Sequence, residues 1–285
     1  MPFTIRKAQL EDAEICGAIC FEAFSQISNN HNFPPDFQNV DQTVGLLSHT
    51  FSRDDLYTTV AELDGKIVGS NVFWENGEIA GVGPITIHPE VQKGSIGKAL
   101  MEDGLKHAKS KGFKSVRLVQ AAFNNMSLAL YTKLGFNVQE PLSAINGPAL
   151  NITIPGYSVR SAGVEDIEVC NELCISIHGH HRNGDLSDAI HQKTASVVER
   201  NGRITGYTTQ IGFFGHAVAE TNEDLKALIG AAEGFAGPGM LLPTRNGEVL
   251  RWCLQNGLKI IQPLSLMSYG PYNEPKGAFL PSIIF

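Results

Sequence analysis

The residues that point most directly to chemistry lie in the segment Gln92–Lys98, which reads QKGSIGK. A helix is expected to begin here, because apolar side chains recur with helical spacing from Ile96 onward. The first backbone N–H groups of a helix have no internal partner, and together with the helix dipole they favour a phosphate group. Glycine permits close approach and unusual dihedral angles, and Lys93 and Lys98 add positive charge. The segment therefore indicates an anion site, although an ordinary helix start fits the same seven residues.

Strands and helices on either side would position this segment. Pro89 should end the preceding strand, because proline cannot donate to a central ladder. Gly112 should end the helix, because glycine is common just past a helix C-terminus. In chain order the sequence predicts a strand at Ile85–Ile87, a helix from Ile96 to Gly112, a strand at Val116–Val119 and a second helix at about Ser127–Leu134.

The whole stretch Ile85–Val138 resembles the cofactor-binding part of the GNAT superfamily, the acetyl-CoA-dependent N-acetyltransferases. The family's loop pattern is Gln/Arg-x-x-Gly-x-Gly/Ala, and here it reads Gln92-x-x-Ser95-x-Gly97, so serine replaces the first glycine. The family's second signature is an asparagine followed seven residues later by the tyrosine of Tyr-x-x-x-Gly-Phe, and Asn124 and Tyr131 match it. The resemblance rests on both signatures at the right separation.

The resemblance implies a fold, a cosubstrate and a set of site residues. The fold would be α+β / α/β, with a mixed sheet and flanking helices, and the cosubstrate would be acetyl-CoA with no metal ion. The residues expected to bind it are Ile85, Thr86, Ile87, Gln92, Lys93, Gly94, Ser95, Ile96, Gly97, Lys98, Asn124, Ser127 and Tyr131.

The resemblance also implies a mechanism in which an amine attacks the thioester directly. The tetrahedral oxyanion needs a donor, such as a backbone N–H of the strand Ile85–Ile87, and proton transfers need a base and an acid. Tyr131 is expected to be the general acid that protonates the leaving thiolate. Many family members carry an acidic base where this chain has Pro84, so the base is placed at Glu78. The alternatives that stay open are Glu75, Glu22 and His88 acting through water.

An internal duplication organises the chain. The segments Ile5–Cys20 and Val159–Cys174 align, and Gly65–Gly69 similarly recurs as Gly202–Gly206. The residues that recur in the first pair are Arg6, Ala8, Glu11, Asp12, Glu14, Cys16 and Cys20, as Arg160, Ala162, Glu165, Asp166, Glu168, Cys170 and Cys174. We therefore expect two tandem GNAT-like copies, a catalytic domain at 1–146 and a degenerate one at 157–285, with a linker at 147–156.

The second copy has lost the phosphate-binding pattern. At the matching place stands Glu220–Leu225, with three carboxylates and no glycine, and Cys253 stands where Tyr131 stands in the first copy. We expect this copy to bind no CoA and to be structural or a wall of the acceptor pocket. The apolar run Tyr269–Phe285 would be its last strand or a cover over the cleft.

Other predictions concern the first copy. Leu56–Leu63 and Lys66–Trp74 should form a hairpin around Asp64-Gly65, and Glu78–Ile87 should be the strand that splays to admit the cofactor. The stretch Phe21–Phe51 is expected to be loop-rich, with candidate acceptor-binding residues at Glu22, His31 and His49.

Composition excludes several classes of protein. No apolar run approaches the roughly 20 residues of a membrane helix, and a net charge of −7 argues against a general nucleic-acid surface. Five cysteines without a secretory signal argue against a disulfide framework and favour core positions, and histidines at 178, 180 and 181 are expected in a loop. The sequence thus predicts a cytoplasmic N-acetyltransferase, monomer or homodimer, acting on an amine of a small molecule or side chain. A non-catalytic CoA-binding sensor or scaffold is the alternative.

Overall fold

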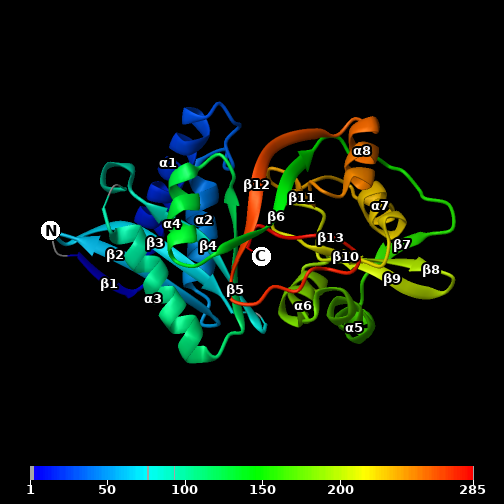
Figure 1. Ribbon diagram of the computed structural model, residues 1–285, viewed down its shortest axis with the longest axis horizontal. Helices are drawn as coiled ribbons and strands as arrows, with labels where there is room; N and C mark the ends of the chain where they lie inside the picture. The colour runs from blue at the N-terminus through cyan, green and yellow to red at the C-terminus, as the bar shows by residue number, and fades with distance from the viewer. Residues whose placement is uncertain (1–2, 76, 93, 285) are drawn as a thin grey trace.

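The protein is a two-lobed α/β molecule whose halves share long strands at its centre (Figure 1). The structure is a computed structural model that describes residues 3–75, 77–92 and 94–284. The first half contains β1 (Phe3–Lys7), α1 (Ala13–Asn30), α2 (Val40–Phe51), β2 (Leu56–Leu63), β3 (Lys66–Trp74), β4 (Ile79–Ile87), α3 (Ile96–Lys111), β5 (Ser115–Ala121), α4 (Asn125–Lys133) and β6 (Asn137–Asn146).

The second half repeats the same order of elements. It contains β7 (Ser158–Ser161), α5 (Ile167–His178), α6 (Asn183–His191), β8 (Ser196–Arg200), β9 (Arg203–Thr208), β10 (Ala217–Ala219), α7 (Asn222–Ala231), β11 (Met240–Pro243), α8 (Gly247–Gln255), β12 (Lys259–Tyr269) and β13 (Ala278–Leu280). The predicted tandem arrangement of two mixed α/β copies is therefore confirmed.

The described strands form two sheets, and the second half contributes two strands to the sheet of the first half. The larger sheet has the order β1-β2-β3-β4-β5-β12-β6-β11, and the smaller has the order β13-β10-β9-β8-β7. Strand β12 of the second half lies between β5 and β6 of the first, antiparallel to both, and β11 pairs with the far edge of β6. The sequence units 1–146 and 157–285 thus do not coincide with the sheets, because β11 and β12 complete the sheet of the first half (Figure 1).

Helices cover both faces of the larger sheet, as the alternation along β3 requires. Val72 packs with Cys16, Cys20 and Leu47 of α1 and α2 on one face. Phe73 packs with Met101 of α3 on the other face. A Cβ added to Gly104 would lie 1.9 Å from the Phe73 ring, so glycine lets α3 approach the sheet.

The duplication is visible in one repeated ion-pair arrangement. Arg6 of β1 binds Asp12 with both terminal nitrogens and also binds Glu62 of β2. Arg160 of β7 binds Asp166 and Glu199 in the same way. Each arrangement joins an edge strand to the turn before the first long helix of its half.

Replacing Asp166 by asparagine should lower the free energy of unfolding by about 2 kcal/mol, because a buried carboxylate would lose charged hydrogen bonds to Arg160. The Arg160 guanidinium lowers the pKa of Asp166. The ionised pair therefore stabilises the fold above the ordinary aspartate pKa and loses this effect as pH falls. Urea unfolding should show the loss at pH 7 and a smaller difference below about pH 4. Glu168→Gln, an exposed change in the same helix, is the control, and equal stability of the Asp166 variant and the parent would contradict the prediction.

Several local predictions are confirmed and one is wrong. The hairpin has the predicted strand bounds, with positive φ at Asp64 and Gly65. The cysteines are free and buried in the core, as expected. The stretch Phe21–Phe51 is not loop-rich, because α1 continues to Asn30 and α2 begins at Val40, leaving one short connection. The Asn39 side chain caps α2 by accepting from the backbone of Gln42, a start signal present in the sequence.

Candidate functional site

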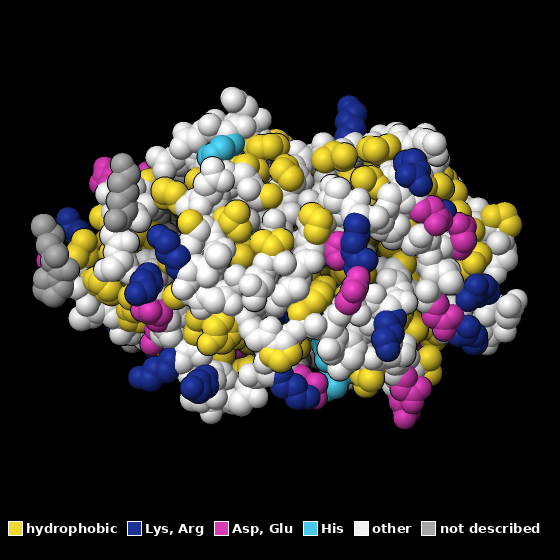
Figure 2. Space-filling model, in the orientation of Figure 1, with side chains coloured by type: hydrophobic (Ala, Val, Ile, Leu, Met, Phe, Trp, Pro, Cys, Tyr) yellow, Lys and Arg dark blue, Asp and Glu magenta, His cyan; other side chains and the backbone are white. Residues whose placement is uncertain are grey.

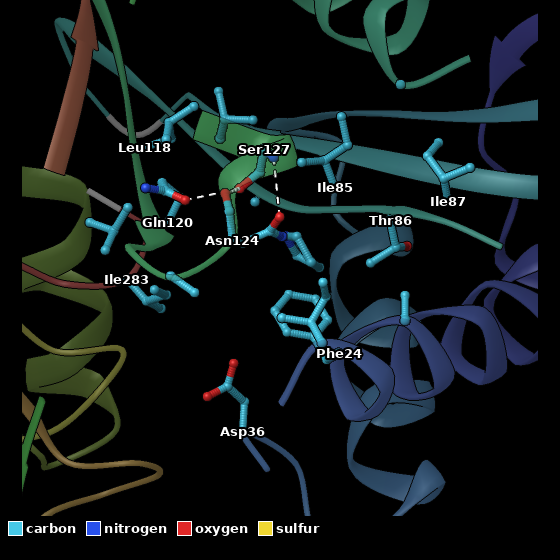
Figure 3. Close-up of a pocket in the computed structure, with 18 of the residues that line it drawn as sticks. Phe24, Asp36, Ile85, Thr86, Ile87, Leu118, Gln120, Asn124, Ser127 and Ile283 are labelled. Atoms are coloured by element: carbon cyan, nitrogen blue, oxygen red, sulfur yellow. Dashed lines mark hydrogen bonds between the residues drawn. The ribbon is translucent and has the colours of Figure 1, made fainter. Parts of the chain in front are cut away.

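A cavity of about 370 Å³ opens where β4 and β5 separate (Figure 3). The two strands pair in parallel only from Ile79–Val82 to Ser115–Leu118. Beyond Val82, Pro84 interrupts β4, and the remainder of the strand pairs with β3 alone. The predicted splay is confirmed, and it exposes main-chain groups of β4 to the cavity.

The N-terminus of α3 opens onto this cavity. Gly94, Gly97 and Lys98 line it, no side chain caps the helix at Ser95, and its first turn holds no acidic residue. Gly94 and Gly97 have ordinary negative φ, so their role here is the absent side chain and not the unusual dihedral expected from the sequence. A Cβ at Gly97 would lie in ordinary van der Waals contact with the side chains of Ile87 and Leu130, at 3.6 and 3.7 Å.

Two residues of the predicted loop need separate comment. Lys93 lies outside the described residues. The Gln92 side chain does not point to solvent, because its Nε2 donates to the backbone oxygen of Ile87 at 3.1 Å and ties the loop to β4.

The cavity edge of β4 presents main-chain donors. The N–H of His88 donates to the oxygen of Val68 on β3. Because main-chain groups alternate along an antiparallel strand, those of Thr86 also face β3 while those of Ile85 and Ile87 face the cavity. The bond from Gln92 to the Ile87 oxygen agrees with this orientation. The predicted strand residues thus lie at the cavity edge, with N–H groups of two of them directed inward.

Helix α4 lies across the cavity from α1. The Asn124 side chain caps α4 by accepting from the N–H of Ser127 at 3.2 Å, and the Ser127 hydroxyl donates to Oε1 of Gln120 at 2.9 Å (Figure 3). Nε2 of Gln120 is buried without a partner among the described residues, so it remains a donor for a bound group. Asn124 and Ser127 therefore both line the cavity and fix the start of the helix that carries Tyr131.

Tyr131 lines the cavity from the fourth helix. Its side chain is 7% exposed and packs 6.0 Å from the Phe136 ring. Burial raises its pKa, so the hydroxyl is protonated at neutral pH. This position is compatible with the predicted role of proton donor, and also with a packing role as a core aromatic residue.

Sequence reasoning missed Asp36, which lies on the short connection between α1 and α2. It is the only carboxylate among the described residues that line the cavity. Oδ1 of Asp36 accepts a 2.8 Å hydrogen bond from Nε2 of Gln262 on β12, and burial raises its pKa. The carboxylate points toward the space between Phe24 and Ile283 (Figure 3). Nothing in the local sequence distinguishes Asp36 from a solvated loop residue, because its partner is 226 residues away.

The proposed base and most of its alternatives lie elsewhere. Glu78 precedes β4 at the end remote from the splay, about 20 Å along the strand from Ile85, and pairs with Lys114 at 3.1 Å. The three alternative bases, Glu75, Glu22 and His88, do not line the cavity either. Glu75 binds His107 at 2.5 Å, and Glu22 lies 3.7 Å from His88.

The candidate acceptor residues are also dispersed. His31 lines a smaller hollow at the rim together with Gln92 and Asn124. His49 is exposed on α2 and does not line the cavity.

The second half contributes a wall of the cavity. Phe213, Phe214, Leu264, Ile283 and Ile284 line it, and the N–H of Ile283 donates to the oxygen of Phe213 at 2.8 Å. The apolar C-terminal run thus both forms strand β13 and continues into the cavity wall, so the two predicted roles for it occur together.

The second half's own cleft is filled. Strand β13 pairs with β10 and lies against β11, the strands equivalent to β4 and β5. All three residues of β13 are buried. Where the first half has an open cavity, the second half therefore has its own C-terminal strand.

The sequence suggested that the acidic residues at the start of α7 would face a cleft, and the structure shows that they do not. Asp224 is fully buried and forms a capping box with Thr221. Glu220 binds Arg203 at 2.6 Å, and Glu223 binds Lys226 at 2.6 Å. The helix start is thus satisfied internally.

Further features concern the rest of the described chain. His178 is the last residue of α5 and not part of a loop as expected, while His180 and His181 follow the helix, and burial lowers the pKa of His180 to about 3. No group of three or more potential His, Cys, Asp or Glu metal ligands occurs within residues 3–75, 77–92 and 94–284. Over the same residues, no helix has the length and apolar character needed to cross a membrane. Acidic and basic side chains are interspersed on the face shown in Figure 2.

Part of the chain is similar in sequence to known proteins. Residues 14–136 match the model of the acetyltransferase (GNAT) family. A mycothiol acetyltransferase of Streptomyces coelicolor is 36% identical over 86 residues, which is 28% of this chain and 27% of that protein. One of Actinosynnema mirum is 41% identical over 61 residues, 21% of this chain and 20% of that protein. The matched region thus spans about a quarter of the length of these relatives.

Solved structures extend the likeness to nearly the whole chain. A putative acetyltransferase from Pyrococcus horikoshii superposes with a TM-score of 0.74 at 16% identity, covering 97% of this chain and 94% of that chain. A tandem GNAT protein from the clavulanic acid biosynthesis pathway superposes with a TM-score of 0.56 at 12% identity, covering 95% and 100%. Residues 14–136 therefore form a domain of the acetyltransferase (GNAT) family, within a chain whose overall fold is similar to that of a tandem GNAT protein.

Proposed function

We propose that this chain is an acetyl-CoA-dependent N-acetyltransferase with one active site, which acetylates an amine of a small molecule or side chain. The observation that carries the proposal is the uncapped N-terminus of α3 opening onto the cavity where β4 and β5 separate. A helix start of this kind favours a phosphate group. Tyr131 lines the same cavity, which supports the proposal because the candidate anion site and the candidate proton donor would then share one space.

The side of the cavity formed by β4, α3 and α4 would bind acetyl-CoA. The N–H groups of the first turn of α3 would hold the pyrophosphate, with Lys98 adding charge at the edge. The inward N–H groups of Ile85 and Ile87 would donate to the thioester oxygen as it becomes an oxyanion. These are fixed backbone dipoles, which stabilise a developing charge without reorganisation.

Tyr131 would act as the general acid. The amine attacks the thioester carbon after its ammonium form has lost a proton to solvent. The C–S bond then breaks, Tyr131 gives a proton to the leaving thiolate, and the proton released by the nitrogen as the amide forms passes to solvent and balances that transfer. Burial raises the pKa of Tyr131 and keeps the phenol protonated until that step.

Two measurements test the function. Titration calorimetry should detect acetyl-CoA binding, and thiol release from acetyl-CoA should become steady when an amine is supplied. Binding without turnover over a broad amine panel would instead support a CoA-binding sensor or scaffold. Absence of acetyl-CoA binding would exclude both.

Ser95→Gly should leave the affinity for acetyl-CoA within about tenfold of the parent, because the structure shows no side-chain cap at Ser95 that glycine would remove. Its backbone N–H would be retained at the same helix start. Calorimetry checks this, and a larger loss would mean that the serine hydroxyl itself binds the ligand.

A further inference from the structure

The half of the cavity opposite the proposed cofactor side is mainly apolar, with Ser28 and one carboxylate as its polar side chains. Phe24 of α1 and Phe37 of the following connection pack edge to face at 5.5 Å. Phe213, Leu264 and Ile283 of the second half form the facing wall. Thr86 and Ser127 lie on the cofactor side in the same view, with Asp36 across from them (Figure 3). We call this apolar half, with Asp36, the acceptor side.

A hydrogen bond from Gln262 fixes the Asp36 carboxylate on the acceptor side. Nε2 of Gln262 donates to its Oδ1 at 2.8 Å, and Gln262 is only 1% exposed. Gln262 comes from β12, so the insertion of this strand between β5 and β6 holds the carboxylate in place. The hydrogen bond uses Oδ1, and the carboxylate points toward the space that an acceptor would enter (Figure 3).

The charges on the cavity wall limit what this side can accept. Among the described lining residues the charged side chains are Asp36 and Lys98, and Lys98 lies at the start of α3 on the cofactor side. One carboxylate balances one ammonium group. A second ammonium group on the acceptor would lie against apolar walls, and a carboxylate on the acceptor would meet no cation there. Burying either charge without a partner costs free energy.

We infer that the acceptor is a monoamine with an apolar or aromatic body, whose single ammonium group is bound by Asp36 while its body packs against the phenylalanines of the acceptor side. This inference rests on the proposed acetyltransferase function and narrows its substrate class. It argues against polyamines, aminoglycosides and free amino acids as preferred acceptors.

Matched acceptors test the inference on the unmodified protein. Butylamine and putrescine differ by a second ammonium group, and phenethylamine and phenylalanine differ by a carboxylate. At saturating acetyl-CoA we expect kcat/KM for each monoamine to exceed that of its partner at least tenfold. Equal or reversed preferences overturn the inference and leave the proposed function standing. Failure of acetyl-CoA to bind would overturn the function itself.

A variant then assigns the preference to Asp36. Asp36→Asn should raise KM for phenethylamine tenfold or more and leave acetyl-CoA affinity within twofold, because it removes the charge on the acceptor side alone. Asp41→Asn, an exposed change at the start of α2, is the matched control and should leave both unchanged. An unchanged KM for Asp36→Asn, with binding of acetyl-CoA intact, overturns the role of Asp36.

Discussion

Tyr131→Phe is expected to lower the turnover rate roughly 100-fold or more, because it removes the proton donor and keeps the ring. The ring packs beside Phe136 in the core of the first half, so phenylalanine should preserve the fold. Burial holds the pKa of Tyr131 above its ordinary range, and the lost hydroxyl would be one that is protonated at every pH where the protein is assayed. The affinity for acetyl-CoA should change little, since the anion site lies on α3.

The measurement is single-turnover acetylation, which isolates the chemical step from product release. Tyr57→Phe is the matched control. The Tyr57 hydroxyl donates to Asp103 at 2.9 Å outside the cavity, so its loss should leave turnover unchanged. A Tyr131 variant with the parental single-turnover rate would reject the general-acid assignment.

Local patterns allowed much of the first half to be predicted. The hairpin was readable because Asp64-Gly65 suits two successive positive φ angles between alternating strands. The end of α3 was readable because Gly112 adopts the left-handed conformation there. The duplication could be predicted because Arg6 and Asp12 recur at the same spacing as Arg160 and Asp166. The structure shows the same ion pair in each half.

The insertion of β12 into the sheet of the first half could not be predicted from these patterns. Strands β6 and β12 have closely similar burial patterns, and either could pair with β5. Which one does so depends on non-local contacts, because β12 reaches β5 across more than 130 residues of chain, as in the pair Leu264 and Ala121. The acceptor side escaped prediction for the same reason, because Asp36 is bonded to Gln262 and faces walls supplied by the second half.

The predicted base, Glu78, does not line the cavity. It lies at the end of β4 where β4 and β5 still pair. The cavity begins only past Val82, so sequence distance along β4 places Glu78 about 20 Å from the reacting groups.

Ser95→Asp is expected to weaken acetyl-CoA binding by roughly 100-fold or more, because a carboxylate at the helix start repels phosphate at a few ångströms. The chain offers a matched control. Thr221 is the N-cap of α7 as Ser95 is the N-cap of α3, so Thr221→Asp places the same charge at the equivalent point of the second half. Aspartate is a good N-cap residue, but here it replaces a hydroxyl that donates to the buried Asp224 carboxylate, so the unfolding transition of the Thr221 variant must match that of the parent before its binding is compared.

The control should leave acetyl-CoA binding unchanged, and calorimetry of the parent should find one site per chain. The sequence had attributed this asymmetry to unpaired carboxylates opposing a phosphate, but Glu220 and Glu223 are paired with basic side chains and Asp224 caps its own helix. The physical basis is different. The capping box occupies the start of α7, and β13 fills the space between β10 and β11. Two sites of similar affinity per chain would contradict a single site, and so would equal weakening of acetyl-CoA binding by Ser95→Asp and Thr221→Asp. Either result would require the second cleft to open by displacing β13, whose three residues are all buried.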